Sequence, residues 1–242
     1  LYSFLAGSRP DSINSSHISQ AANFIGRINQ RSEISSLPAA ADACVSWQDH
    51  LDLAQIRVAR LMHMTPSTQL AVQAREFAAT ELLPCWTQLV ASLRDEVTLC
   101  DQTAVLSQQD QILSPSDFGF HNALENDGIL NFVDFEYAGW DDPAKLICDF
   151  MCQPERPATL NQGRQFMVEI IDQFPHPDTV KHRVQSLLPF HRLKWCCILL
   201  NEFRLEDLDR RLHAAGGKLP VSQADQLVKA RQYFSAHLAA PN

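Results

Sequence analysis

The dipeptide Asp127-Gly128 constrains the fold of this chain more than any other feature, because it lies between two short apolar segments. Ala123-Leu124 lies before the dipeptide, and the residues from Ile129 to Val133 follow it. An Asp-Gly pair in this setting is typical of a tight type I′ turn, which joins two antiparallel strands. The sequence therefore predicts a β-hairpin with Asp127 and Gly128 as its two loop residues.

The expected register brings polar side chains together at the open end of this hairpin. Counting back from the turn places Asn122 opposite Val133, so Asn122 and Asp134 lie about one residue out of register. Cross-strand neighbours are roughly 5 Å apart at Cβ, and Mg²⁺ binds oxygen ligands at about 2.1 Å. Both side chains can therefore reach one metal ion. Asp117 precedes the first strand and can face the same point, where an Asp could orient or accept the proton of an attacking hydroxyl.

The residues Ser114 to Asn122, followed by Val133-Asp134-Phe135-Glu136, resemble the aminoglycoside phosphotransferase and choline kinase family. These small-molecule kinases have a protein-kinase-like fold, with a His-x-Asp-x-x-x-x-Asn loop, a short hairpin and an Ile/Val-Asp-Phe/Trp-Glu segment. The resemblance implies that Asp117 is the catalytic base and that Asn122 and Asp134 are Mg²⁺ ligands. It also implies an ATP-dependent phosphotransferase that acts on a hydroxyl of a small molecule.

The resemblance extends beyond this segment in both directions. Residues 138–143 and Asp149 are similar to the family's Gly-x-Gly-Asp-Pro and following Asp-Leu-Ala, and Asp149 is then expected to brace the catalytic loop. Residues 1–7 resemble, more weakly, the hinge that passes the adenine ring. This implies nucleotide contacts from the backbone of Ser3, Phe4 and Leu5. The expected domains are a hinge-like segment at 1–10 and a C-terminal catalytic lobe at 11–242.

Two departures from the family pattern bear on this interpretation. Pro115 stands where the family has the His of the catalytic loop, so the geometry of that loop is in question. Enzymes of this type also need a Gly-rich loop and a strand Lys on the phosphates, but the first Lys here is Lys145. We expect a fragment without its N-terminal lobe, and a natural single-lobe protein remains the alternative.

The rest of the chain has mainly helical patterns. Helices are expected near residues 15–28, 39–62, 67–94, 143–152, 159–173, 178–203 and 222–238. Ser15 or Ser16 is expected to cap the first helix, and Pro189 to break the sixth. The predicted fold class is mainly α with a small β-hairpin, a protein-kinase-like C-lobe whose N-terminal lobe is absent from this chain.

Composition excludes several classes of function. The net charge of −8 argues against a nucleic-acid surface and is compatible with a cationic acceptor such as an aminoglycoside or choline. Sugar-like alcohols remain equally open as acceptors. The seven cysteines form no Cys-x-x-Cys pair, which favours a reduced, cytoplasmic protein without a zinc site. No apolar run is long enough to span a membrane, and the sequence does not determine the oligomeric state.

Some residues near the expected site have simpler explanations. Asp142 before Pro143 is expected to be a helix N-cap, and His121 a hydrogen-bonding spacer in the loop. Glu136 could support the metal or the substrate, or could be solvated. A kinase-like pseudoenzyme or binding module without the phosphate-binding Lys is the main functional alternative. A metal-dependent hydrolase is a weaker one.

Overall fold

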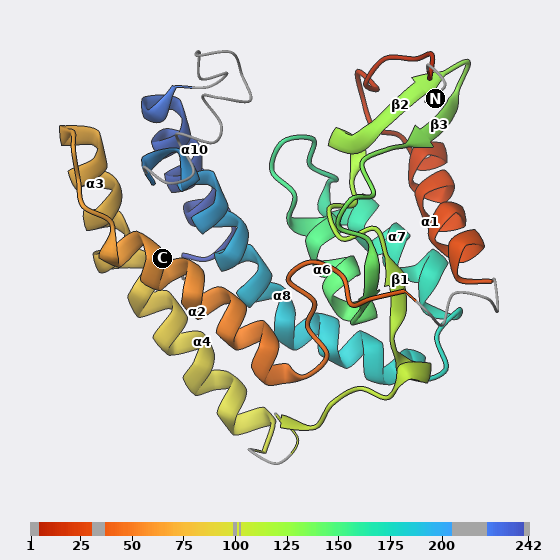
Figure 1. The fold of residues 1–242 in the computed structure, drawn as a ribbon, viewed down its shortest axis with the longest axis horizontal. Coiled ribbons are helices and arrows are strands. Elements are labelled where there is room, and N and C mark those ends of the chain that lie inside the picture. The colour runs from red at the N-terminus through yellow and green to blue at the C-terminus, as the bar shows by residue number, and fades with distance from the viewer. Residues whose placement is uncertain (1–4, 31–36, 99–100, 102, 205–221, 240–242) are drawn as a thin grey trace. The chain divides into compact units, whose positions relative to one another are not determined.

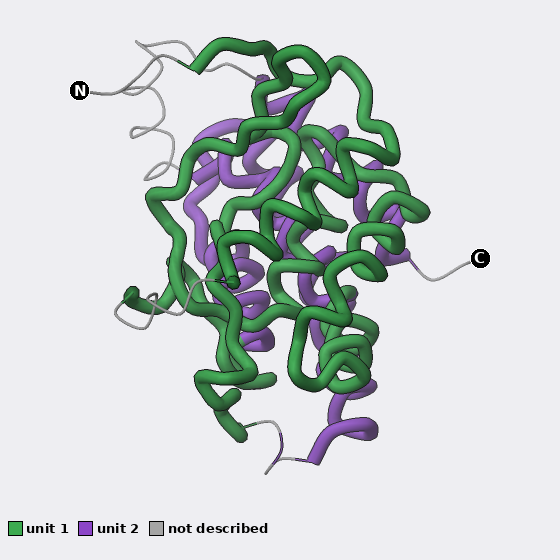
Figure 2. The backbone as a smooth tube through the Cα atoms, turned by 90° about the vertical axis from the view of Figure 1, so that its right-hand side faces the viewer, with its two compact units in different colours: residues 1–49, 103–188 green, residues 50–102, 189–242 purple. Residues whose placement is uncertain are grey.

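The computed structural model describes residues 5–30, 37–98, 101, 103–204 and 222–239. It divides into two compact units, which Figure 2 colours separately. Unit 1 comprises residues 1–49 and 103–188, and unit 2 comprises residues 50–102 and 189–242. Each unit therefore combines segments that lie far apart in the sequence.

The predicted hairpin is confirmed in unit 1, where β2 (Ala123–Asn126) pairs with β3 (Ile129–Phe132) in an antiparallel sheet. Asn126 pairs with Ile129, as expected for a two-residue loop. Asp127 and Gly128 have φ angles of 50° and 76°, and a type I′ turn requires positive φ at both central positions. Figure 1 shows this hairpin beside helix α1 (Ser15–Asn29).

A second small antiparallel sheet in unit 1 was not predicted. It pairs β1 (Ile112–Ser114) with β4 (Gly139–Asp141), so it joins the segments immediately before and after the hairpin and the loop that contains Asp117. Ala39 forms an isolated parallel bridge to Trp140 in the same region. The helix expected over 39–62 therefore begins later, since α2 spans Trp47–His63.

Phenylalanine side chains form the centre of unit 1. Phe150 on α6 (Pro143–Cys152) stacks on Phe166 of α7 (Leu160–Ile171), with ring centroids 3.9 Å apart. Phe118, in the loop that contains Asp117, contacts both of these rings and Phe132 of β3. The loop, the hairpin and two helices are therefore joined through one aromatic cluster.

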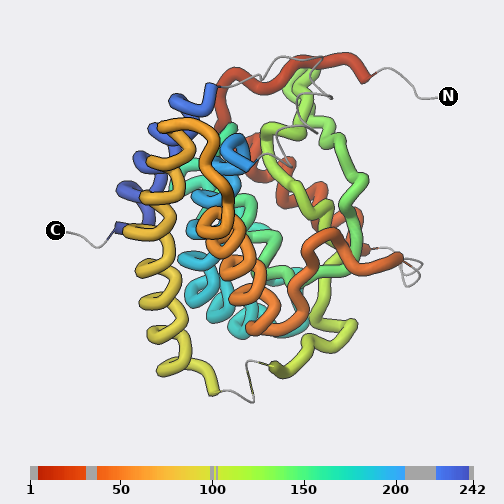
Figure 3. The backbone as a smooth tube through the Cα atoms, turned by 60° about the vertical axis from the view of Figure 1, so that its left-hand side comes forward, coloured from red at the N-terminus to blue at the C-terminus, as the bar shows by residue number. Residues whose placement is uncertain are grey.

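The described residues of unit 2 are mainly helical and include no strand. Its main segments are α3 (Gln69–Phe77), the π-helical turn Ala78–Leu82, α4 (Leu83–Glu96) and α10 (Gln223–His237), together with most of α2 and the second half of α8 (Pro177–Leu199). Figures 1 and 3 both show α2 alongside α4. Apolar side chains from all these helices form its core, among them Leu61, Leu82, Leu193 and Phe234.

Three short 3₁₀ turns complete the described elements, at Gln108–Asp110, Phe120–Asn122 and Asn201–Phe203. Two local expectations are wrong. Asn14, and not Ser15 or Ser16, caps α1, with its side chain accepting a hydrogen bond from the backbone N–H of His17. The helix α8 is continuous through Pro189.

The predicted fold class, mainly α with a small β-hairpin, is confirmed, with the β1–β4 pair as an addition. Within the described ranges, no helix has both the length and the apolar character needed to cross a bilayer.

Candidate active site

The segment that leads to Asp117 turns sharply. The backbone N–H of Asp117 donates to the carbonyl of Pro115 at 3.0 Å, and Ser116 between them has a φ of 68°. An i to i+2 hydrogen bond around a residue with positive φ is the rarer and more strained form of γ-turn. Ser116 is held there because its N–H donates to Ser114 Oγ and its hydroxyl donates to the carbonyl of Ala41. Backbone strain of this kind concentrates at functional sites.

The residues that follow Asp117, from Phe118 to His121, are all buried. Phe118 and Phe120 are buried in the aromatic cluster of unit 1. The side chain of Asp117, by contrast, remains 43% exposed. The two phenylalanines therefore anchor the loop to the aromatic cluster of unit 1 and leave the Asp117 carboxylate accessible to a substrate.

Asn122 connects the loop to the hairpin. Its side-chain Nδ2 donates to the backbone carbonyl of Asp117 at 3.0 Å, and its own carbonyl accepts from the N–H of Val133 at 3.0 Å. Asn122 therefore lies opposite Val133, as the register predicted. The first of these bonds also uses the amide nitrogen, so the Oδ1 atom is the one left to act as a ligand.

Asp134 follows directly after Val133 and is exposed, with a φ of 69°. Asp tolerates this left-handed conformation better than most residues do. The next residue, Phe135, is stacked on Phe24 of α1, with ring centroids 5.6 Å apart and an interplanar angle of 15°. The aromatic contact fixes the backbone on the far side of Asp134.

The amide oxygen of Asn122 and the carboxylate of Asp134 form a donor set that suits Mg²⁺, which prefers oxygen ligands. Mg²⁺ sites in nucleotide enzymes commonly use only one or two protein carboxylates and complete their shell with water and substrate phosphates. Across the part of the chain that the structure describes, no group of three or more His, Cys, Asp or Glu residues is placed to hold a metal. The metal roles of Asn122 and Asp134 therefore stay predictions, as does the catalytic role of Asp117.

His121 makes a contact that the sequence did not reveal. Its Nε2 lies 3.1 Å from Oδ1 of Asp117, and its side chain is only 8% exposed. The spacing of four residues is a signal that could have suggested the contact, but no helix was expected there. The predicted spacer thus hydrogen-bonds the expected catalytic side chain itself.

Buried ion pairs join the end of β4 to α6, where the sequence resembles the family's Gly-x-Gly-Asp-Pro segment. Asp141 accepts from Lys145 Nζ at 2.6 Å and from the N–H of Cys44 at 2.9 Å. Asp149 lies 3.8 Å from the same ammonium. Burial raises the pKa of Asp141 above its ordinary value, while the attraction of Lys145 opposes this shift. The charges of Asp141 and Asp149 raise the pKa of Lys145 despite its burial, so the ammonium is charged.

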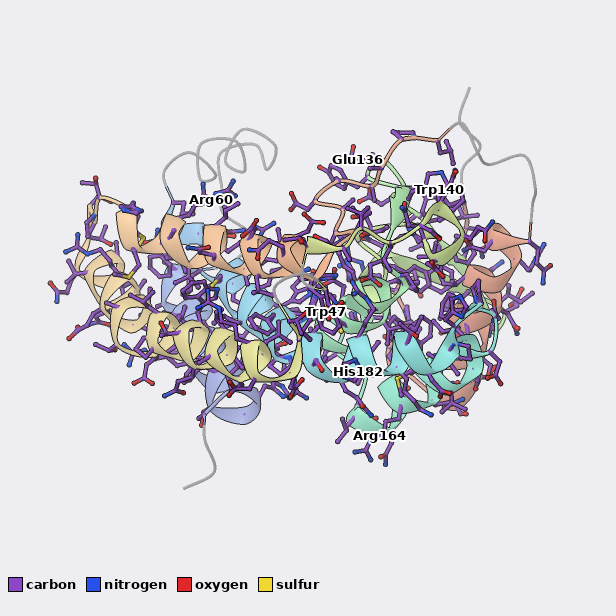
Figure 4. All side chains as sticks on the ribbon, turned by 90° about the horizontal axis from the view of Figure 1, so that it is seen from below. Trp47, Arg60, Glu136, Trp140, Arg164 and His182 are labelled. Carbon is purple, nitrogen blue, oxygen red and sulfur yellow. The ribbon has the colours of Figure 1, made fainter. Side chains whose placement is uncertain are left out.

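Asp142 has the predicted capping role and a further partner. Its Oδ1 accepts from the N–H of Ala144 at 2.7 Å, which caps α6. Its Oδ2 forms a buried ion pair with Arg183 of α8, whose guanidinium also lies 4.6 Å from the ring centroid of Trp47. Trp47 meets His182 edge to face, and Figure 4 labels both residues. No local sequence pattern predicts this ion pair between residues 41 positions apart.

The hinge-like segment is only partly described. Ser3 and Phe4 lie outside the described residues, and Leu5 is 41% exposed. Ser8 and Glu125 of β2 exchange backbone hydrogen bonds at 3.1 and 2.7 Å, so this segment runs along the hairpin edge. The adenine contact of Ser3, Phe4 and Leu5 stays a prediction. Glu136, which Figure 4 labels, is exposed in the loop between β3 and β4.

Neither protein-family models nor curated protein sequences match this chain. Solved structures do. The ethanolamine kinase of Plasmodium vivax matches with a TM-score of 0.56 at 12% identity, over 98% of this chain and 63% of its own. A choline/ethanolamine kinase family protein of Mesorhizobium loti matches with a TM-score of 0.51 at 14% identity, over 95% and 66%. The choline kinase of Cryptosporidium parvum Iowa II matches with a TM-score of 0.50 at 11% identity, over 97% and 71%.

These matches confirm the predicted resemblance at the level of the fold. The chain spans less than two thirds of the length of the first two kinases. Its short antiparallel sheets and helices correspond to a kinase-like C-lobe, and the loop and hairpin described above lie within it. The chain has the fold of the choline and ethanolamine kinases.

Proposed function

We propose that this chain is the catalytic lobe of an ATP- and Mg²⁺-dependent phosphotransferase that acts on a hydroxyl of a small molecule. The observation that carries the proposal is the hydrogen-bonded connection of loop and hairpin. Asn122 bonds to Asp117 through its side chain and to Val133, the neighbour of Asp134, through its backbone. These three polar residues, five and twelve positions apart in the sequence, are thereby connected at one end of the hairpin, in a fold shared with small-molecule kinases.

In this proposal each side chain has one role. The exposed carboxylate of Asp117 orients the acceptor hydroxyl and takes its proton as the hydroxyl oxygen attacks the γ-phosphorus of ATP. The bond from that phosphorus to the β–γ bridging oxygen breaks, and ADP leaves. Oδ1 of Asn122 and the carboxylate of Asp134 would hold Mg²⁺. The bound ion would supply positive charge that neutralises the phosphates during transfer. The hydrogen bonds of the loop keep these groups in position before substrate arrives, which lowers the reorganisation that the reaction requires.

In this proposal the Lys that binds the nucleotide phosphates belongs to the N-terminal lobe and not to this chain. Lys145, the first Lys of the chain, is 3% exposed and bonded to Asp141, so it cannot also reach a nucleotide phosphate. We therefore assign residues 1–10 to the hinge and residues 11–242 to the C-terminal lobe, with the Lys on the other lobe. The backbone of Ser3, Phe4 and Leu5 would then meet the adenine. An aminoglycoside, choline or a sugar-like alcohol would be the acceptor.

The test is the substitution Asp117→Asn in the two-lobed protein, assayed by transfer of the γ-phosphoryl group of labelled ATP to a panel of amino alcohols, aminoglycosides and sugars. Turnover should fall by about two to four orders of magnitude, which is the usual contribution of a general base. Asp127→Asn is the matched control, since Asp127 is exposed in the hairpin turn and its Asn tolerates the same positive φ. Near-normal turnover in Asp117→Asn would sink the mechanism.

A kinase-like binding module is the second candidate. It is favoured by Pro115, which stands where the resembled family has the His of its loop, and by the burial of Lys145, whose ammonium is bonded to Asp141. The module would bind nucleotide without transferring phosphate to any acceptor. Nucleotide binding measured with and without Mg²⁺, beside the acceptor panel, separates the two candidates.

A further inference from the structure

The imidazole of His121 is enclosed beside the loop that carries Asp117. Its Nε2 faces Oδ1 of Asp117 at 3.1 Å. The rest of the ring is covered, since the side chain is only 8% exposed. By contrast, 43% of the Asp117 side chain is exposed. One carboxylate oxygen therefore contacts a buried ring, while the carboxylate as a whole remains accessible.

Gly119 provides the space for this ring. A Cβ atom at position 119 would lie 2.9 Å from His121 Nδ1 and 3.2 Å from Cε1, closer than side chains normally pack. The φ of Gly119 is 171°, an extended conformation that any residue can adopt. The backbone therefore does not require glycine here. The position of the imidazole does.

The hydrogen-bonding partners of the ring determine which nitrogen carries the proton. His121 Nδ1 is buried and has no hydrogen-bond partner among the described residues. A proton on Nδ1 would leave a buried donor unpaired and place the bare Nε2 against a carboxylate oxygen, which is unfavourable on both counts. A proton on Nε2 instead donates to Asp117. In the neutral imidazole, the geometry therefore selects the Nε2–H tautomer.

We infer that His121 is the positioning residue for the Asp117 carboxylate. Its Nε2–H donates to Oδ1 and fixes the rotation of the carboxylate, so that Oδ2 faces the acceptor. Pro115, two residues before Asp117, has no side-chain or backbone donor for this task. The support therefore comes from the C-terminal side of the loop. This inference rests on the proposed function for its catalytic consequence, but the hydrogen bond itself can be tested without any activity.

The first experiment examines the bond alone. The protein is labelled with ¹⁵N-histidine, and its imidazole tautomers are read from two- and three-bond ¹H–¹⁵N correlations, with His121 assigned through His121→Gln. We expect the Nε2–H form in the wild type and an altered His121 signal in Asp117→Ala. A wild-type Nδ1–H form, or a signal that does not change in Asp117→Ala, would overturn the inference.

The second experiment examines catalysis with four variants. His121→Leu should lower kcat by about 10- to 100-fold, the usual effect of a misplaced catalytic group, while the KM for ATP stays within about twofold. His121→Gln should recover at least about tenfold of that loss, because the Gln amide nitrogen reaches the place of Nε2. Gly119→Ala keeps the imidazole but displaces it, so it should resemble His121→Leu. His17→Leu is the control, since His17 is also buried and contacts Glu125, not Asp117.

The outcomes distinguish a failure of the positioning role of His121 from a failure of the proposed phosphotransferase function. A His121→Leu protein with kcat within about twofold of the wild type would refute the positioning role. A kcat loss of the same size in His17→Leu would also refute it, because the effect would then be a general loss of packing. If the wild type transfers phosphate to no acceptor, the proposed function fails, and the tautomer measurement still decides whether His121 holds Asp117.

Discussion

Lys145 is the residue whose replacement should reveal most about the stability of this fold. The substitution Lys145→Met keeps the length and apolar stem of the side chain but removes the ammonium that lies 2.6 Å from Asp141 and 3.8 Å from Asp149. Lys145 is 3% exposed and Asp141 is fully buried. Water therefore cannot take the place of the lost charge.

The expected loss follows from this burial. Removing one partner of a buried ion pair leaves an uncompensated charge, which typically lowers the free energy of unfolding by about 3–5 kcal/mol. Because the total free energy of unfolding of a protein is about 5–15 kcal/mol, this loss is a large fraction of it. In a protein of this size the melting temperature should fall by roughly 10 °C.

The loss of stability should also depend on pH, and the pKa of Asp141 determines whether it grows or shrinks as pH rises. Burial already raises the pKa of this carboxyl in the folded protein, and the attraction of Lys145 opposes that rise. Without Lys145 the folded pKa rises further, while the unfolded value stays the same. The variant's deficit therefore grows as pH rises from the wild-type folded pKa to the higher pKa of the variant.

Urea unfolding at about pH 5 and about pH 8 tests both the size of the stability loss and the direction of its pH dependence. Lys181→Met is the matched control, because Lys181 is exposed at the start of α8. The double substitution Asp141→Asn with Lys145→Met should restore most of the stability, since Asn Oδ1 can still accept from the N–H groups of Cys44 and Asp142. A Lys145→Met protein within about 0.5 kcal/mol of the wild type, or a deficit that shrinks with rising pH, would refute this reasoning.

Three further outcomes can be checked. Arg183→Met should lower the free energy of unfolding by about 3–5 kcal/mol in a denaturant titration, because it leaves the fully buried Asp142 without its cation; a neutral result would contradict the pairing. Gly128→Ala should lower it by only about 1–2 kcal/mol, since the added Cβ meets nothing within 4 Å and only the φ of 76° opposes it; a larger loss would contradict that account. Asp134→Asn should weaken Mg²⁺-dependent nucleotide binding at least about tenfold by calorimetry and leave Mg²⁺-independent binding unchanged; equal losses in both would exclude a metal role.

The hairpin could be predicted from sequence because its determinants are local. Asp127-Gly128 fixes both the turn type and the register, and the register then places Asn122 opposite Val133. The spacing of the expected site residues follows from the same count. Helices such as α6 and α10 were also predictable, since capping residues and apolar periodicity lie within one short segment.

The contacts that the sequence did not reveal depend on tertiary structure. The β1–β4 pair has three residues in each strand, too few to display an alternating pattern. The Asp142–Arg183 ion pair joins residues 41 positions apart, and nothing in either local segment identifies the partner. The His121–Asp117 contact is local, but it needs the 3₁₀ turn at Phe120–Asn122, which no periodic pattern announces.

The hydrogen bond from the Val133 N–H to the Asn122 carbonyl gives this protein a built-in reporter. That single amide lies beside Asp134 and closes the open end of the hairpin. Its proton exchanges with solvent deuterium only when the two strands separate there, so its protection factor measures the free energy of that local opening. Deuterium uptake at Val133 would thus report, without any substrate, how often the two strands separate at the positions that carry Asn122 and Asp134.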